Sequence, residues 1–216
     1  KRYKRFLVDV KINNKIVTAH CPNTGSMLGL LKKGNKVWLS KSDNPERKLK
    51  YTLQIIEDKK SKVGINTHLA NKIVLNALND KLIPNFIELK SIKKEVKFGD
   101  NTRFDFLVLN DDRKTFIEVK NVTLSRKKGV AEFPDAVTSR GHKHIRELLK
   151  AKKQGYEVYL LYLIQRNDCN EFKIAKDIDR KYDELLTKAV KKNLKILCSD
   201  CKFSSKGIKL NSKINF

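Results

Sequence analysis

Three residues on two adjacent predicted strands could together bind a divalent metal ion and cleave a phosphodiester. Asp105 lies in the apolar run 104–109, and Glu118 and Lys120 lie in the run 116–120. Both runs are rich in β-branched and aromatic residues, as is typical of strands. Because side chains alternate along a strand, Glu118 and Lys120 share one face, roughly 7 Å apart along the chain. Asp105 lies close to that face if the two strands pair as a hairpin.

The chemistry that this set would support is metal-dependent hydrolysis. Mg²⁺ prefers hard oxygen ligands and keeps several waters, so one or two carboxylates such as Asp105 and Glu118 are enough to bind it. The metal polarises the phosphate and helps to generate hydroxide from a bound water. Lys120 would orient that water or stabilise negative charge on the phosphoryl oxygens. The alternative is a hairpin with a solvated polar face, on which Glu118 and Lys120 form only a surface ion pair.

The chain is strongly basic, which favours a polyanionic partner. Its 216 residues include 48 Lys or Arg against 24 Asp or Glu, giving a formal net charge of +24 and a pI near 9.9. Residues 1–64 hold 16 basic against 5 acidic residues (+11), and the remaining 152 hold 32 against 19 (+13), so positive charge is denser in the first part. Nucleic acid is the simplest such partner. Only 10 of the basic residues are Arg, a bias towards Lys that an AT-rich genome also produces.

Hydrophobic content and cysteine usage indicate a folded protein of a reducing compartment. With 40% hydrophobic residues the chain can form cores and is not a disordered basic tail. No apolar run approaches the ~20 residues of a membrane span, so no membrane partner is expected. The four cysteines do not suggest a disulfide framework in a chain of this length, which favours the cytoplasm. Cys198 and Cys201 have the spacing of a zinc or redox motif, but two ordinary thiols near a terminal strand are the favoured interpretation.

Residues 1–66 are predicted to form a small β-barrel of the OB type that binds nucleic acid. Five short strands with polar connections are typical of such a barrel. Asn13 and Asn14 suit a tight hairpin turn between the first two strands. The basic connection that contains Arg47 and Lys48 favours a binding barrel over one that is only a structural cap. The strands are expected at 5–12, 15–21, 36–40, 51–57 and 62–66.

Residues 67–216 are predicted to form a three-layer α/β domain. Periodic apolar residues indicate helices, and a continuous apolar run indicates a strand covered on both faces. The two site strands are joined by a polar turn, 110–113, which contains Asp112. The expected order is a helix at 67–82, strands at 92–98, 104–109 and 116–120, a helix at 136–152, a strand at 157–164, a helix at 179–193 and a strand at 194–199.

The helix at 136–152 adds candidates for phosphate binding. Three of its basic residues fall within about one turn, so part of its exposed face is expected to be basic. Such contacts would hold a phosphate backbone without reading bases. Asp135 precedes the helix and is expected to cap it, with metal binding as the alternative. The complete set of candidate nucleic-acid contacts is Lys4, Arg5, Arg47, Lys48, Arg140, Lys143 and His144.

The order of the elements in the second domain, with an acid on its second strand and E-x-K on its third, resembles the PD-(D/E)XK nuclease superfamily. From residue 3 to about residue 150 the chain more specifically resembles the sugar fermentation stimulation protein A (SfsA) family. The segments that carry this resemblance lie in the expected order and at matching spacing. They are 3–6 (YKRF), 20–27 (HCPNTGSM), 66–67 (NT), 95–99 (EVKFG), 103–106 (RFDF), 117–124 (IEVKNVTL) and 133–144 (FPDAVTSRGHKH).

The resemblance implies an N-terminal OB-like domain and a C-terminal nuclease-like domain. It also implies DNA binding with little sequence preference and a role in regulating sugar (maltose) metabolism. By motif match the catalytic residues would be Asp105, Glu118 and Lys120. A Mg²⁺ or Mn²⁺ ion would be bound by Asp105, Glu118 and Glu95. The superfamily often adds an acid on the first helix, where this chain offers only Asp80.

The sequence supports three functional hypotheses that share this fold. The first is a DNA-binding protein with a working metal-dependent nuclease site. The second is a DNA-binding regulator whose nuclease fold is catalytically silent. The third is an RNA-binding or RNA-processing protein, because OB barrels accept either polymer. We expect DNA binding first, with nuclease activity as an addition to it.

Overall fold

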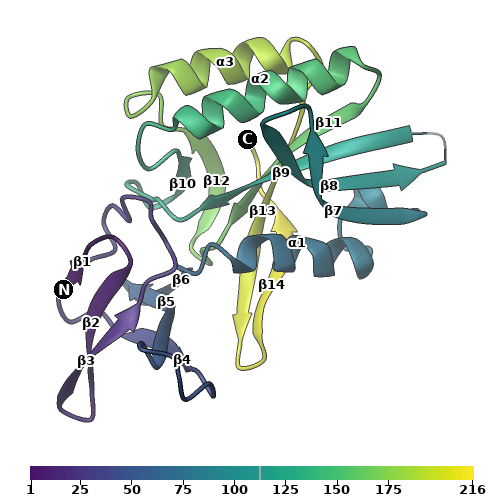
Figure 1. The fold of residues 1–216 in the computed structure, drawn as a ribbon. Helices are drawn as coiled ribbons and strands as arrows, with labels where there is room; N and C mark the ends of the chain where they lie inside the picture. The colour runs from purple at the N-terminus through teal and green to yellow at the C-terminus, as the bar shows by residue number, and fades with distance from the viewer. Residues whose placement is uncertain (112) are drawn as a thin grey trace.

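The chain folds into a small β-barrel followed by a larger α/β domain (Figure 1). The computed structural model describes residues 1–111 and 113–216, and Asp112 of the predicted turn between the site strands lies outside them. The purple and blue barrel lies beside one end of the α/β domain, which carries the α-helices of the described residues. This arrangement agrees with the predicted fold class.

The barrel owes its shape to short strands that alternate apolar and polar residues. The strands follow the order β1-β2-β3-β5-β4, with β6 also paired to β5. Asn13 and Asn14 have φ values of 46° and 65°, as a tight hairpin turn requires, so the predicted turn is confirmed. Ala19, Leu53 and Val63 are fully buried in the interior. The bounds are β1 (Arg2–Tyr3), β2 (Leu7–Ile12), β3 (Lys15–His20), β4 (Val37–Lys41), β5 (Tyr51–Asp58) and β6 (Ser61–Gly64).

A six-stranded sheet forms the middle layer of the α/β domain, in the order β14-β13-β11-β9-β8-β7. The strands β9, β11 and β13 run parallel in its centre. There the near-continuous apolar run of β11 is buried on both faces. The bounds are β7 (Ser91–Phe98), β8 (Thr102–Asn110), β9 (Arg113–Val122), β11 (Glu157–Ile164), β13 (Lys195–Ser204) and β14 (Gly207–Lys213).

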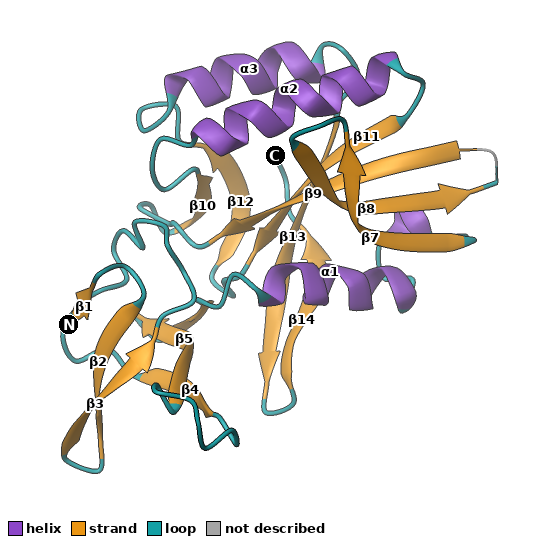
Figure 2. Ribbon diagram, in the orientation of Figure 1, coloured by secondary structure: helices purple, strands orange, loops and turns teal. Residues whose placement is uncertain are grey.

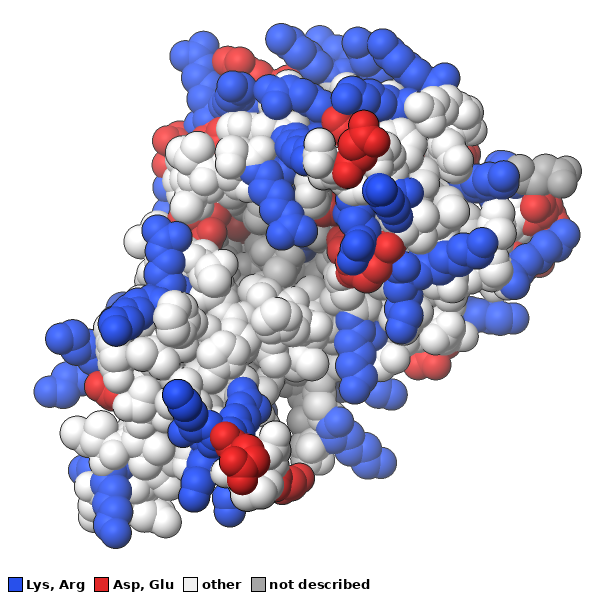
Figure 3. Space-filling view, viewed as in Figure 1, with Lys and Arg blue, Asp and Glu red and all other residues white. Residues whose placement is uncertain are grey.

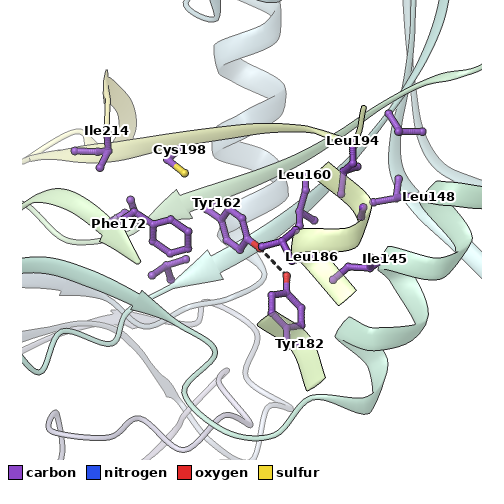
Figure 4. Close-up of a cluster of buried hydrophobic side chains, with 14 of the residues drawn as sticks. Ile145, Leu148, Leu160, Tyr162, Phe172, Tyr182, Leu186, Leu194, Cys198 and Ile214 are labelled. Carbon is purple, nitrogen blue, oxygen red and sulfur yellow. Dashed lines mark hydrogen bonds between the residues drawn. The ribbon is translucent and has the colours of Figure 1, made fainter. Parts of the chain in front are cut away.

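Helices cover both faces of this sheet (Figure 2). Helix α1 (Leu69–Asn79) packs on one face, and α2 (Ser139–Lys153) and α3 (Arg180–Val190) lie side by side on the other. The core beneath α2 and α3 contains Tyr162 and Tyr182, whose hydroxyls form a hydrogen bond of 2.7 Å (Figure 4). The predicted three layers are therefore present. In the described ranges, no helix is both long and apolar enough to cross a membrane.

Several elements were not predicted from the sequence. The missed strands are β1, β14 and the pair β10 (Gly129–Phe133) and β12 (Cys169–Ile174), which form a separate parallel sheet. A 3₁₀ helix at Pro84–Phe86 was also missed. Strands β10 and β12 are short, and α2 and β11 lie between them in the sequence. Neither strand is next in sequence to its partner, so no hairpin pattern indicates them.

The prediction that Asp135 caps α2 was wrong. The helix begins one residue after Thr138, which caps it by accepting a hydrogen bond from Gly141 N at 3.0 Å. Asp135 joins the two domains instead. Its Oδ2 accepts a hydrogen bond from Met27 N at 3.1 Å, and its backbone carbonyl accepts one from Ser26 Oγ at 2.7 Å.

A second junction between the domains is buried at the end of β6. The guanidinium of Arg166, which is 2% exposed, donates to Asp58 of the barrel at 3.2 Å and to the carbonyl of Thr123 at 3.0 Å. Gly64 N donates to the carbonyl of Gln165 at 2.8 Å. A Cβ on Gly64 would lie 2.2 Å from Gln165 Oε1, so a larger residue would displace that side chain. The barrel is thus fixed to the α/β domain by buried polar contacts.

The cysteines form no disulfide, and all four are buried and free. Cys198 packs in the core beneath α2 and α3, whereas Cys201 packs in the core beneath α1. Residues three apart on a strand point to opposite faces, which explains this separation. The two side chains therefore do not form a zinc or redox pair, and their interpretation as ordinary thiols is confirmed.

Candidate active site

Strands β7 and β8 are distorted at the position of the predicted acids. Phe104 packs beneath α2 and α3 and Phe106 beneath α1, although residues two apart on a regular strand share a face. The register pairs Lys94 with Phe106 and Val96 with Phe104 but skips Glu95, which has a left-handed backbone with a φ of 52°. Pairing of β8 with β9 begins only at Phe106 and Ile117. Strands β8 and β9 are therefore separated at Asp105, which opens space for side chains between them.

Asp105 connects the separated strands through its carboxylate. Its Oδ2 accepts a hydrogen bond from Val119 N, and its Oδ1 accepts one from Asn71 Nδ2 of α1, both at 2.7 Å. Burial, and then the negative charge of Glu118, raise the pKa of Asp105 to about 7. The two hydrogen bonds favour the ionised form and partly oppose this rise in pKa. Asp105 therefore changes its charge close to neutral pH.

Glu118 lies in a contrasting environment on the α2 side of the site. It is 3% exposed, and its Oε1 accepts a hydrogen bond from Lys120 Nζ at 2.8 Å. His144 Nδ1 also contacts this oxygen and lies 3.1 Å from Lys120 Nζ. Burial alone would raise the pKa of Glu118, but the charge of Lys120 and the hydrogen bond with His144 lower it to about 2. Glu118 is therefore ionised at neutral pH.

The two carboxylates have the properties expected of metal ligands. Glu118 Oε2 is buried and has no hydrogen-bond partner among the described residues. A bound cation would also relieve the repulsion between Asp105 and Glu118 that contributes to the raised pKa. Residues 1–111 and 113–216 contain no group of three or more His, Cys, Asp or Glu side chains arranged to hold a metal. An ion bound by these two acids would therefore rely on water for its remaining ligands, as Mg²⁺ commonly does.

Glu95, the third predicted ligand, lies at the edge of this arrangement. It is exposed on β7, and its Oε1 lies 3.4 Å from Asn71 Nδ2, the same amide that donates to Asp105. Asp80 is exposed at the C-terminal end of α1 and does not reach the site. The first helix therefore supplies an amide, Asn71, where the resemblance implied an acid. Sequence reasoning did not identify this residue.

A cleft of about 710 Å³ is formed by α1, α2 and strands β7 to β9. The site residues that line it are Asn71, Glu95, Asp105, Glu118 and Lys120. Arg103 and Arg140 lie on its walls. Arg140 Nε contacts His144 Nε2 at 3.4 Å, and its two terminal nitrogens have no partner in the described part of the chain. Figure 3 shows a hollow between the two domains, with Lys and Arg side chains spread over the surface around it. The cleft thus combines the buried Glu118 and the half-buried Asp105 with basic groups that are free to contact a phosphate.

The structure separates the predicted nucleic-acid contacts into three exposed pairs and one buried residue. His144 is 6% exposed and contacts the site residues of β9, so its prediction as part of an exposed basic face was wrong. The exposed residues are Lys4 and Arg5 between β1 and β2, Arg47 and Lys48 before β5, and Arg140 and Lys143 on α2.

Comparison with known proteins agrees with this architecture. Residues 1–65 match the family model described as the SfsA N-terminal OB domain, and residues 68–207 match the model described as the sugar fermentation stimulation protein RE domain. The chain is 56% identical over 214 residues to the sugar fermentation stimulation protein homolog of Pelagibacter ubique, which covers 99% of this chain and 92% of that protein. The homolog from Brucella anthropi is 44% identical over 210 residues, or 96% of this chain and 90% of that protein.

A solved structure covers the same two domains. The structure of Pyrococcus furiosus SfsA in complex with Ca²⁺ matches 100% of this chain and 92% of that chain, with a TM-score of 0.90 and 26% sequence identity. The N-terminal barrel is accordingly an OB domain. From the family models and these relatives together, the chain belongs to the sugar fermentation stimulation protein A (SfsA) family.

Proposed function

We propose that this protein binds DNA with little sequence preference and cleaves it with a divalent metal ion at Asp105, Glu118 and Lys120. The observation that carries the proposal is the meeting of two carboxylates, with pKa values of about 7 and about 2, in one cleft. Carboxylates whose environments shift their pKa values in opposite directions are typical of catalytic sites.

Each side chain has a distinct role in this proposal. Asp105 and Glu118 would hold Mg²⁺ or Mn²⁺, which polarises the phosphate and supplies a hydroxide nucleophile when bound. Lys120, held by Glu118 and His144, would stabilise negative charge on the phosphoryl oxygens. Arg140 would bind the phosphate backbone through its free terminal nitrogens. The Ca²⁺ named with the Pyrococcus furiosus relative supports a divalent ion here, because Ca²⁺ and Mg²⁺ both prefer oxygen ligands.

Cleavage is tested with plasmid and single-stranded DNA incubated with Mg²⁺ or Mn²⁺. We expect the wild type to cut at least one of these substrates, and Asp105→Ala and Glu118→Ala to lose the activity. Glu88→Ala serves as a control because Glu88 is exposed and does not line the cleft. The nuclease proposal is wrong if the wild type leaves every substrate intact with both metals.

Binding is tested separately by titrating labelled DNA at several salt concentrations. Because bound Lys and Arg displace counterions from phosphates, the logarithm of the affinity should fall linearly with the logarithm of the salt concentration. Affinities for unrelated sequences should agree closely, and single-stranded RNA added as a competitor shows which polymer is preferred. Differences of several orders of magnitude between DNA sequences would contradict a sequence-tolerant binder.

A catalytically silent DNA-binding regulator is the second candidate, and one observation favours it. Lys120 Nζ already contacts both Glu118 and His144, so without rearrangement it has fewer bonds to offer a substrate. This candidate predicts DNA binding that survives Glu118→Ala, with no cleavage by the wild type. A regulatory role in sugar metabolism, which the relatives' name suggests, would fit either candidate.

A further inference from the structure

A second, smaller pocket lies beside the cleft, where the barrel meets the α/β domain. It has a volume of about 320 Å³ and is lined by the barrel loop at 23–25, by β9 and β10 and by the start of α2. Thr67, Asn121 and Arg140 line both this pocket and the cleft. A chain bound in the cleft can therefore extend into the pocket past Arg140.

The pocket is lined by hydrogen-bonding groups. Asn23 is 5% exposed, and its Oδ1 accepts a hydrogen bond from Gly25 N at 2.8 Å. Asn121 Oδ1 accepts one from Gln165 Nε2 at 2.6 Å. The side-chain NH₂ groups of Asn23 and Asn121 have no partner in the described ranges and are free to donate. Asp135, whose carboxylate lies beside Gly25, adds an acceptor.

The size of the pocket limits what it can hold. Small-molecule sites commonly measure roughly 300–1,000 Å³, so this pocket suits one nucleotide and is too small for a base pair. Enzymes that act on a single nucleotide often receive it in such a pocket, where the edge of its base meets hydrogen-bonding groups. The pocket offers both donors and an acceptor, next to an arginine with free terminal nitrogens, and so matches that requirement.

We propose that this pocket holds one unpaired nucleotide next to the phosphate bound in the cleft. The substrate class that follows is single-stranded DNA, or duplex DNA with an unpaired end. This inference rests on the proposed function, since it needs DNA in the cleft. It adds the requirement that the nucleotide next to the bound phosphate is unpaired.

The experiment measures binding by fluorescence anisotropy in EDTA, so that no metal-dependent cleavage occurs. Three labelled DNAs of one sequence are compared: a single strand, a duplex with an unpaired tail and a blunt duplex. Thr24→Leu fills the pocket from an exposed position, and Thr187→Leu makes the same change on the exposed surface of α3 as a control. We expect the wild type and Thr187→Leu to bind the single strand and the tailed duplex at least about tenfold tighter than the blunt duplex. Thr24→Leu should bind all three equally.

The outcomes separate this inference from the proposed function. Equal wild-type affinity for tailed and blunt duplexes would overturn the pocket assignment alone, because DNA binding itself would stand. Identical preferences in Thr24→Leu and Thr187→Leu would overturn it as well. A protein that bound none of the three DNAs would overturn the proposed function too. A direct titration with a deoxynucleoside monophosphate, followed by NMR, should shift the amide signals of Asn23 and Asn121 in the wild type.

Discussion

Asp105 and Glu118 face the same cleft but receive different partners from its two walls. On the α1 side, Asp105 is bonded by neutral groups, the Asn71 amide and the Val119 backbone. On the α2 side, Glu118 is bonded by Lys120 and His144. At Asp105 the neutral donors do not offset burial and the neighbouring negative charge, whereas at Glu118 the charge of Lys120 and the bond with His144 do. The first carboxyl therefore titrates near neutral pH, and the second remains a permanent anion.

The largest expected effect comes from removing the charge on the α2 side. Glu118→Gln leaves Lys120, whose side chain is 11% exposed, without its negative partner. Losing one member of a buried ion pair typically lowers the free energy of unfolding by about 3–5 kcal/mol. Urea denaturation measures the change, with Glu184→Gln as a control. Glu184 forms an exposed ion pair with Arg180 on α3, so its loss should cost no more than about 0.5 kcal/mol. Equal losses of unfolding free energy in the two variants would show that the pair of Glu118 and Lys120 contributes no more than an exposed ion pair.

The next effect concerns the pH dependence of metal binding on the α1 side. A carboxyl must lose its proton to bind a metal, and the pKa of Asp105 is about 7. Mn²⁺ affinity measured by calorimetry should therefore rise about tenfold per pH unit up to pH ~7 and then level off. Glu118 contributes no slope there because its pKa is about 2. Asp105→Asn should bind Mn²⁺ weakly and lose the slope. A slope that persists in this variant would assign the titration to another group.

A smaller effect tests the neutral donor itself. Asn71→Ala removes one hydrogen bond that favours the ionised form of Asp105, so its pKa should rise further and Mn²⁺ binding at pH 6 should weaken. The free energy of unfolding should fall by about 1 kcal/mol, the usual contribution of such a bond. Asn76→Ala is the matched control, because Asn76 is exposed on the same helix. If both variants bind Mn²⁺ like the wild type, Asn71 does not tune Asp105.

The smallest effect separates the basic groups of the cleft from those elsewhere on the surface. Arg140→Ala should reduce the slope of log affinity for DNA against log salt concentration by about one, since one phosphate contact is lost. Lys188→Ala, on the exposed surface of α3, should leave the slope unchanged. Equal slopes for both variants would place the DNA path outside the cleft.

What the sequence predicted well were features fixed by neighbouring residues. The apolar run at 157–164 coincides with β11, and the Asn13–Asn14 turn follows from residues that tolerate a left-handed backbone. Asp105, Glu118 and Lys120 were found because acids and a lysine interrupt apolar strands, and the structure brings them together.

What the sequence did not reveal depends on packing between distant elements. Asn71 reaches Asp105 only because α1 packs against the sheet, although its place beside the buried residues Ala70 and Val74 was a signal. His144 is polar, so the pattern of apolar residues in α2 did not place it on the buried face. It precedes the buried Leu148 by four residues, which puts it on the inner face of the helix.

The buried junction around Gly64, Gln165 and Arg166 has a consequence for how the molecule melts. Arg166 pairs with Asp58 of the barrel while holding a carbonyl of the α/β domain. If the barrel unfolded first, the buried ion pair between Arg166 and Asp58 would be broken. The hydrogen bond from Gly64 N to the carbonyl of Gln165 would be lost as well. We therefore expect a single calorimetric transition for the whole chain, and isolated halves that are each less stable than the intact protein.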